Sequence, residues 1–121
     1  MGFPTDSESG AENGPALWTR LLEQSASGPV VFEVHEPTTG HPSRVHDTYG
    51  GAEIPAFRRA LVETLRARAV RREVFRITAN AFVIVATEPT PSRWSFQYRE
   101  LEVAIAVRTL QLSETMPGVT G

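Results

Sequence analysis

The sequence predicts a two-layer α+β domain, in which a mainly antiparallel sheet carries two helices packed on one face. Three observations lead to this class. Residues 74–110 form two runs rich in β-branched and aromatic side chains, separated by a proline-rich link at residues 88–93. Residues 55–72 repeat apolar side chains at helical spacing, and residues 15–27 do so more briefly. The expected order of elements is α-β-(β)-α-β-β.

The elements before residue 74 follow from local patterns. A short helix is expected at residues 15–27, with proline at its first position and a Gly-Pro stop after it. Residues 30–36 alternate as a strand, and residues 37–40 make a turn. Residues 43–49 form a weakly patterned returning strand. The main helix at residues 55–72 presents an apolar stripe that contains Phe57, Leu61 and Leu65.

The two β-rich runs predict one long C-terminal hairpin, because the prolines of the link cannot donate to a ladder. In the second run, apolar side chains occupy even positions up to Tyr98 and odd positions from Leu101. A strand keeps its phase unless a residue is added, so we expect a β-bulge at Arg99-Glu100. The bulge would collect the apolar side chains of both strands on one core face.

Length and composition favour one cytoplasmic domain. The 121 residues are divided into a disordered acidic tail at 1–13, a single domain at 14–112 and a flexible tail at 113–121. The chain has no cysteine, which excludes thiolate chemistry and suits a reducing compartment, and it has no run long enough to span a membrane. All twelve basic residues are arginine, as expected from a GC-rich bacterial genome.

The leading functional hypothesis is a non-enzymatic protein-interaction or assembly module that associates with itself or another protein. No nucleophile motif and no phosphate-binding loop occurs, so we assign no catalytic residue and expect no cofactor. The outer face of the predicted hairpin is mixed, and Phe82 and Ile84 are its two large apolar side chains. A locally covered patch or scattered surface apolar residues explain them as well as a contact surface for a second copy or a partner does. The residues expected on this interaction face are Phe82, Ile84, Gln97, Arg99 and Glu102.

A first alternative is a nucleic-acid-associated regulator that uses the basic end of the second helix. Arginines cluster there in a chain whose net charge is only −2. A solvated helix face with internal ion pairs explains the same residues. The possible nucleic-acid contacts are Arg68, Arg71, Arg72 and Arg76.

A second alternative is a small metal-assisted enzyme. His35, His41 and His46 fall within twelve residues, together with Asp47. Imidazole and carboxylate groups are common metal ligands, and a hairpin could bring them together. The spacings match no metal-binding motif, so surface histidines in a polar hairpin are the default explanation of the pattern.

Overall fold

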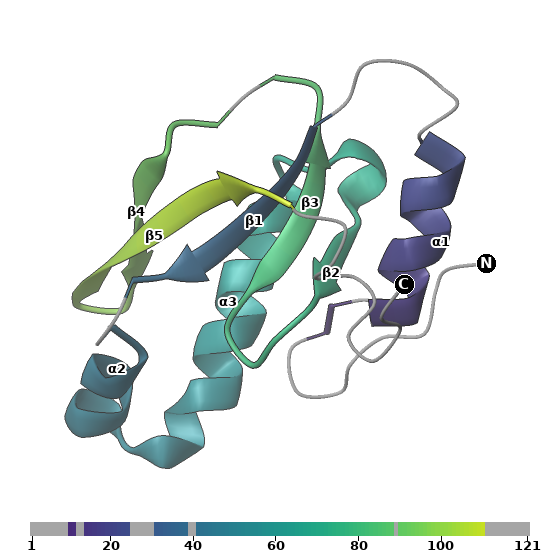
Figure 1. Ribbon diagram of the computed structural model, residues 1–121. Helices are drawn as coiled ribbons and strands as arrows, with labels where there is room; N and C mark the ends of the chain where they lie inside the picture. The colour runs from purple at the N-terminus through teal and green to yellow at the C-terminus, as the bar shows by residue number, and fades with distance from the viewer. Residues whose placement is uncertain (1–9, 12–13, 25–30, 39–40, 89, 111–121) are drawn as a thin grey trace.

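The computed structural model describes residues 10–11, 14–24, 31–38, 41–88 and 90–110, and these residues form an α+β fold (Figure 1). One five-stranded antiparallel sheet is accompanied by three α-helices and two short 3-10 helices within this part of the chain. The elements, in chain order, are α1 (Gly14–Gln24), β1 (Val31–Pro37), α2 (His41–Tyr49), η1 (Gly51–Glu53), α3 (Ile54–Arg66), η2 (Val70–Arg72), β2 (Val74–Arg76), β3 (Phe82–Ala86), β4 (Arg93–Tyr98) and β5 (Leu101–Thr109). None of the described helices is both long enough and apolar enough to cross a membrane.

The sheet has the strand order β2-β3-β1-β5-β4, and every pair of neighbours is antiparallel. The central strand is β1, where Val34 stands opposite Val83 on one side and Arg108 on the other. Because material packs on both faces of β1, the consecutive residues Glu33, Val34 and His35 are all buried. The strands β2 and β4 form the two edges.

The single long hairpin predicted for residues 74–110 is wrong, because the first run folds back on itself. The strand β2 ends at Arg76, and the chain turns before β3 begins at Phe82. The turn is closed by the Ile77 amide, which donates to the Ala81 carbonyl at 3.0 Å. The strand β3 then pairs with β1 and not with β4. The core face expected across one hairpin is therefore divided between the two faces of the sheet.

A two-residue turn, and not a β-bulge, reverses the apolar phase at Arg99-Glu100. The strands β4 and β5 form a tight hairpin in which Tyr98 stands opposite Leu101, and Arg99 has a φ of 54°. In this register each even-numbered residue of β4 faces an odd-numbered residue of β5, such as Phe96 opposite Val103. Both apolar sets thus point to one face without an added residue.

The segment expected to return as a strand, residues 43–49, lies within the helix α2. Val45 is fully buried, and Tyr49 packs against the same cluster one helical turn later. Two apolar residues at this spacing are too few for periodicity to separate a helix from a strand. The observed order of α-helices and β-strands is consequently α-β-α-α-β-β-β-β.

The larger core cluster lies between α3 and one face of the sheet, which we call the inner face. As predicted, α3 presents Phe57, Leu61 and Leu65 at intervals of four residues, and all three are buried. Each large side chain buried in this way contributes about 1.5–3 kcal/mol relative to exposure. The sheet supplies Val74, Phe82, Ile84, Phe96, Tyr98, Val103 and Ile105 from β2, β3, β4 and β5.

The helix α1 packs on the outer face of the sheet, opposite α3, which corrects the expectation that both predicted helices share one face. Its Leu17 is fully buried in a cluster with Phe75 and Val83, whose side chains alternate with those beneath α3. The Arg20 guanidinium forks onto the Glu73 carboxylate, with N···O distances of 2.7 and 2.8 Å. The α+β class and the helical layer on the inner face are confirmed, and α1 covers the β2–β3 end of the outer face.

Residues 10 and 11, which were expected in the N-terminal tail, pack against the core. Ala11 is fully buried in the inner-face cluster. The Gly10 carbonyl accepts a hydrogen bond of 2.6 Å from the Arg66 guanidinium. The folded domain thus begins before residue 14. The predictions for residues 1–9, 12–13 and 113–121 fall outside the described residues.

Candidate functional site

A buried Glu–His pair on β1 is the most unusual feature of the core. Glu33 and His35 point to the inner face, where their exposed fractions are 4% and 0%. Burying a carboxylate and an imidazole in a small domain is unfavourable unless every polar atom finds a partner. The partners of this pair therefore decide what the site can do.

Hydrogen bonds satisfy both side chains and define their protonation states. Thr90 donates to the Glu33 carboxylate twice, from its amide at 2.8 Å and from its hydroxyl at 2.6 Å. The Trp94 indole donates to His35 Nδ1 at 3.0 Å, and an indole N–H cannot accept. Nδ1 is thus unprotonated, and Nε2–H donates to Glu33 Oε1 at 3.1 Å. Within the described residues, no buried side-chain nitrogen or oxygen is left without a partner.

The pKa shifts of the pair agree with this assignment. Burial lowers the pKa of His35, and the positive charge of Arg68 adds to that effect, against the opposing influence of Glu33. Burial acts to raise the pKa of Glu33, but the hydrogen bonds from Thr90 and His35 outweigh it, and the pKa falls below its ordinary value. Near neutral pH the pair consists of a neutral imidazole and an ionised carboxylate.

The network reaches the surface through Trp94 and Arg68. The indole packs edge-on against His35, with ring centroids 6.0 Å apart. The guanidinium carbon of Arg68 lies 4.7 Å from the centroid of the Trp94 ring, which is a cation–π contact. A chain of contacts thus runs from the buried carboxylate to an exposed cation just beyond the C-terminal end of α3.

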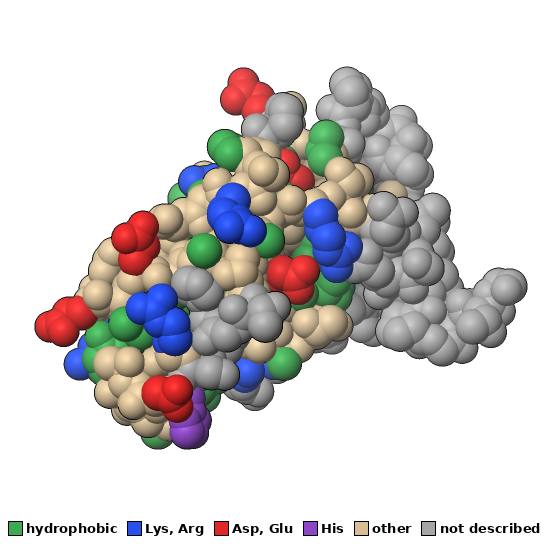
Figure 2. All heavy atoms as spheres, turned by 60° about the vertical axis from the view of Figure 1, so that its left-hand side comes forward, with side chains coloured by type: hydrophobic (Ala, Val, Ile, Leu, Met, Phe, Trp, Pro, Cys, Tyr) green, Lys and Arg blue, Asp and Glu red, His purple; other side chains and the backbone are tan. Residues whose placement is uncertain are grey.

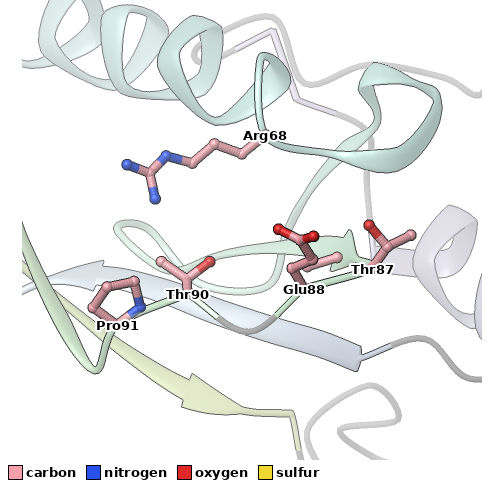
Figure 3. Close-up of a pocket in the computed structure, with 6 residues that line it drawn as sticks. Arg68, Thr87, Glu88, Thr90 and Pro91 are labelled. Atoms are coloured by element: carbon pink, nitrogen blue, oxygen red, sulfur yellow. The ribbon is translucent and has the colours of Figure 1, made fainter.

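A pocket of about 250 Å³ opens beside this cation, between the end of α3 and the loop that joins β3 to β4 (Figure 3). The guanidinium of Arg68 and the carboxylate of Glu88 both face this space from different walls. Neither group forms an ion pair with another described residue. The residues that line the pocket are Arg68, Ala86, Thr87, Glu88, Thr90 and Pro91.

The four arginines predicted as nucleic-acid contacts lie in different surroundings. Arg68 stacks on Trp94, whereas Arg71 and Arg72 are exposed in η2 with φ values of 59° and 57°. The Arg76 guanidinium donates to two main-chain carbonyls of the β2–β3 turn, at 3.1 and 3.2 Å. Figure 2 shows acidic and basic side chains interspersed over the described part of one face.

The two histidines whose side chains the structure describes lie in different surroundings. His35 is buried, and both of its ring nitrogens form hydrogen bonds. His46 is exposed on α2, where its Nδ1 lies 3.5 Å from Asp47 Oδ1. The side chain of His41 lies outside the described part of the structure. No group of three or more potential ligands occurs among the described residues. The geometry therefore gives no support to a metal-assisted enzyme built on these residues.

The predicted interaction face is also divided. Phe82 and Ile84 are fully buried beneath α3, so they are core residues and not surface contacts. Gln97 and Glu102 stand opposite each other on the exposed outer face of the β4–β5 hairpin. Arg99 sits in the turn, where its guanidinium pairs with the Glu53 carboxylate at 2.7 Å.

The edge strand β4 exposes main-chain hydrogen-bonding groups. The Val107 amide donates to the Ser92 carbonyl at 2.9 Å, so Ser92 and Val107 are a hydrogen-bonded pair of the β4–β5 ladder. Hydrogen-bonded and non-hydrogen-bonded pairs alternate along an antiparallel ladder. Every second residue of β4 therefore bonds to β5, and the N–H and C=O groups of Arg93, Ser95 and Gln97 point away from it. No other described strand pairs with this edge.

The alternating sequence of β1 is enough to predict part of the site. Alternation places Glu33 and His35 on the same side of the strand, and a carboxylate two residues from a histidine can reach it. The contributions of Thr90 and Trp94 were missed, because they lie more than fifty residues away and no local pattern connects them.

Comparisons of the chain with protein-family models, curated proteins and solved structures find no significant match.

Proposed function

We propose that this chain is a non-enzymatic protein-interaction module that self-associates through the unpaired edge of its sheet. In this association β4 pairs with β4 of a second copy. The observation that carries the proposal is the edge of β4, where three residues present unpaired main-chain groups within the described structure. Such an edge is a template for a further strand. The lack of cysteine favours the cytoplasm as the place of association.

One register uses the whole edge. A two-fold axis at Ser95 places Arg93 of one copy opposite Gln97 of the other, so all three outward-pointing residues pair. On the inner face, the same register places Trp94 opposite Phe96 of the second copy. It brings no like charges of β4 face to face, and it joins two sheets into one.

The strength of this contact follows from its size. Antiparallel pairing of three outward residues on each copy adds about six main-chain hydrogen bonds, each worth about 1 kcal/mol net. Cross-strand aromatic pairs add about 0.5–1.5 kcal/mol each. Loss of translational and rotational freedom opposes these gains. These gains come to about 7–9 kcal/mol, and association costs about 4 kcal/mol or more, so we expect weak, reversible dimers with a Kd of about 0.2 mM or weaker.

Sedimentation velocity tests the proposal between about 50 μM and about 2 mM, because a Kd of about 0.2 mM places the transition in this range. The wild-type chain should shift from monomer to dimer. The variant Ser95→Pro removes the outward N–H at the centre of the pairing and leaves the bonds to β5 intact, so it should remain monomeric. Ser95→Thr keeps the N–H group and should dimerise like the wild type.

A second variant distinguishes edge pairing from a dimer in which the outer faces of two sheets stack on each other. Ala104 lies on the outer face of β5, away from the edge. Ala104→Glu should leave edge pairing intact but would break a dimer that stacks two outer faces. A wild-type chain that stays monomeric, or a dimer that persists in Ser95→Pro, would contradict edge pairing. Far-UV circular dichroism checks that each variant is folded.

A second candidate function is phosphate-backbone binding at the end of α3 and η2, as in a nucleic-acid-associated regulator. Arg71 and Arg72 are both exposed in the left-handed region, which is unfavourable by about 1–2 kcal/mol for each residue with a side chain. Strain of this kind concentrates at functional sites.

Fluorescence anisotropy with generic duplex DNA and RNA tests this second candidate. Binding should weaken as salt rises, and the double variant Arg71→Gln/Arg72→Gln should lose it, whereas Arg93→Gln on β4 should not. Absence of binding at about 50 mM salt would rule it out.

A further inference from the structure

The pocket between α3 and the β3–β4 loop holds one cation and one anion that do not neutralise each other. Arg68 approaches from the end of α3, and Glu88 approaches from the loop (Figure 3). Both side chains are exposed, and neither forms an ion pair with a described residue. The pocket thus offers two separate, complementary points of attachment for a charged ligand.

The threonine hydroxyls add to the contrast between the cationic side of the pocket, at Arg68, and the acceptor side, on the β3–β4 loop. The hydroxyl hydrogen of Thr90 is used by the Glu33 carboxylate at 2.6 Å, so only its lone pairs remain for a ligand. Glu88 is also an acceptor, whereas Arg68 can only donate. Thr87 can do either. One wall therefore attracts a negative acceptor, and the loop attracts a positive donor.

We propose that this pocket binds a small zwitterion the size of a free amino acid, with its carboxylate on Arg68 and its ammonium group on Glu88 and Thr90. A phosphate or a simple carboxylate would satisfy Arg68 but would be repelled by Glu88. An amine alone would be repelled by Arg68. The cavity of about 250 Å³ lies below the range of about 300–1,000 Å³ that is usual for larger ligands.

The buried network prepares this site before the ligand arrives. Trp94 supports the guanidinium of Arg68 at 4.7 Å, and His35 holds the indole by the 3.0 Å hydrogen bond. Glu33 fixes both His35 and Thr90. Side chains that are already ordered lose less entropy on binding. This gives a functional reason for keeping an ionised carboxylate and a histidine inside a small core.

The experiment is a titration of the full ¹⁵N-labelled chain with each standard L-amino acid, followed through the Trp94 indole and Thr90 amide signals. At least one amino acid should cause saturable shifts. Its N-acetylated form and its carboxamide form should each bind at least about tenfold more weakly, because a lost charged contact is worth about 1.4 kcal/mol or more. Inorganic phosphate should bind no better than the N-acetylated form.

Matched variants locate the two charges. Arg68→Gln and Glu88→Gln should each weaken binding about tenfold or more. Arg71→Gln and Glu102→Gln remove the same charges from exposed positions outside the pocket and should bind like the wild type. The proposal is overturned if no free amino acid gives saturable shifts, if a blocked form or phosphate binds as tightly as the zwitterion, or if either pocket variant keeps its affinity.

Discussion

Replacing Trp94 by phenylalanine should reduce the dependence of stability on pH as well as stability itself. The indole donates to His35 Nδ1 at 3.0 Å, and phenylalanine leaves this buried nitrogen without a donor. An unsatisfied buried polar group lowers the free energy of unfolding by about 1–3 kcal/mol. We expect a loss of this size at pH 8, where His35 is neutral in the folded and the unfolded chain.

The pH dependence follows from the lowered pKa of His35, to which burial contributes most and the charge of Arg68 adds. The indole also opposes protonation, because its hydrogen bond to Nδ1 is made only to the neutral ring. The unfolded chain binds a proton below about pH 6.5, whereas the folded chain does not until its lower pKa is reached. Wild-type stability should thus fall as pH drops below about 6.5, by up to about 1.4 kcal/mol per pH unit. The pKa of Glu33 is also lowered, and its contribution is lost only below about pH 4.3.

In Trp94→Phe, the freed Nδ1 can take up a proton beside the Glu33 carboxylate. The folded pKa of His35 should then rise toward its ordinary value, and the slope between about pH 6.5 and about pH 5 should flatten. A simple loss of ring packing would lower stability equally at every pH. The difference between pH 8 and pH 5 therefore separates the lost hydrogen bond from the lost contact area.

Urea unfolding followed by far-UV circular dichroism measures these slopes. His35→Gln should remove the slope, and His46→Gln should leave it unchanged, because His46 is exposed on α2. If Trp94→Phe or His35→Gln retains the wild-type slope, the assignment of a neutral His35 held by the indole is refuted.

Three further outcomes follow from other parts of the fold. Thr90→Val removes the hydroxyl that donates to Glu33 at 2.6 Å, and urea unfolding should show a loss of about 1.5–3 kcal/mol, as is usual for hydrogen bonds to charged groups. Hydrogen exchange of a dilute, monomeric sample should show faster exchange at the amides of Arg93, Ser95 and Gln97 than at the residues between them, and uniform protection along β4 would contradict the deduced ladder. Arg71→Gly should raise the unfolding free energy by up to about 1 kcal/mol, since glycine accepts the φ of 59° without strain, and a loss of stability would show that the arginine side chain holds the turn.

Several elements could be predicted because their patterns are local. The stripe of Phe57, Leu61 and Leu65 recurs at the helical repeat over three turns, so α3 and its buried side follow from spacing alone. The change of phase between Tyr98 and Leu101 is equally local, and it marks the position where the strand is in fact interrupted, between β4 and β5. A bulge and a two-residue turn change the phase alike, so the pattern could not distinguish them.

The sequence alone determined the α+β class, the helix α3 and the shared side of Glu33 and His35 on β1, because propensity and alternation act over a few neighbouring residues. Only the tertiary structure decided that β3 pairs with β1, that Phe82 lies under α3, and that the side of β1 bearing the Glu–His pair is covered. Strand partners and covering layers are chosen by contacts between residues far apart in the chain, where burial of the whole surface outweighs local preference. For the same reason, the buried carboxylate, the indole and the surface arginine become one site only after the chain has folded.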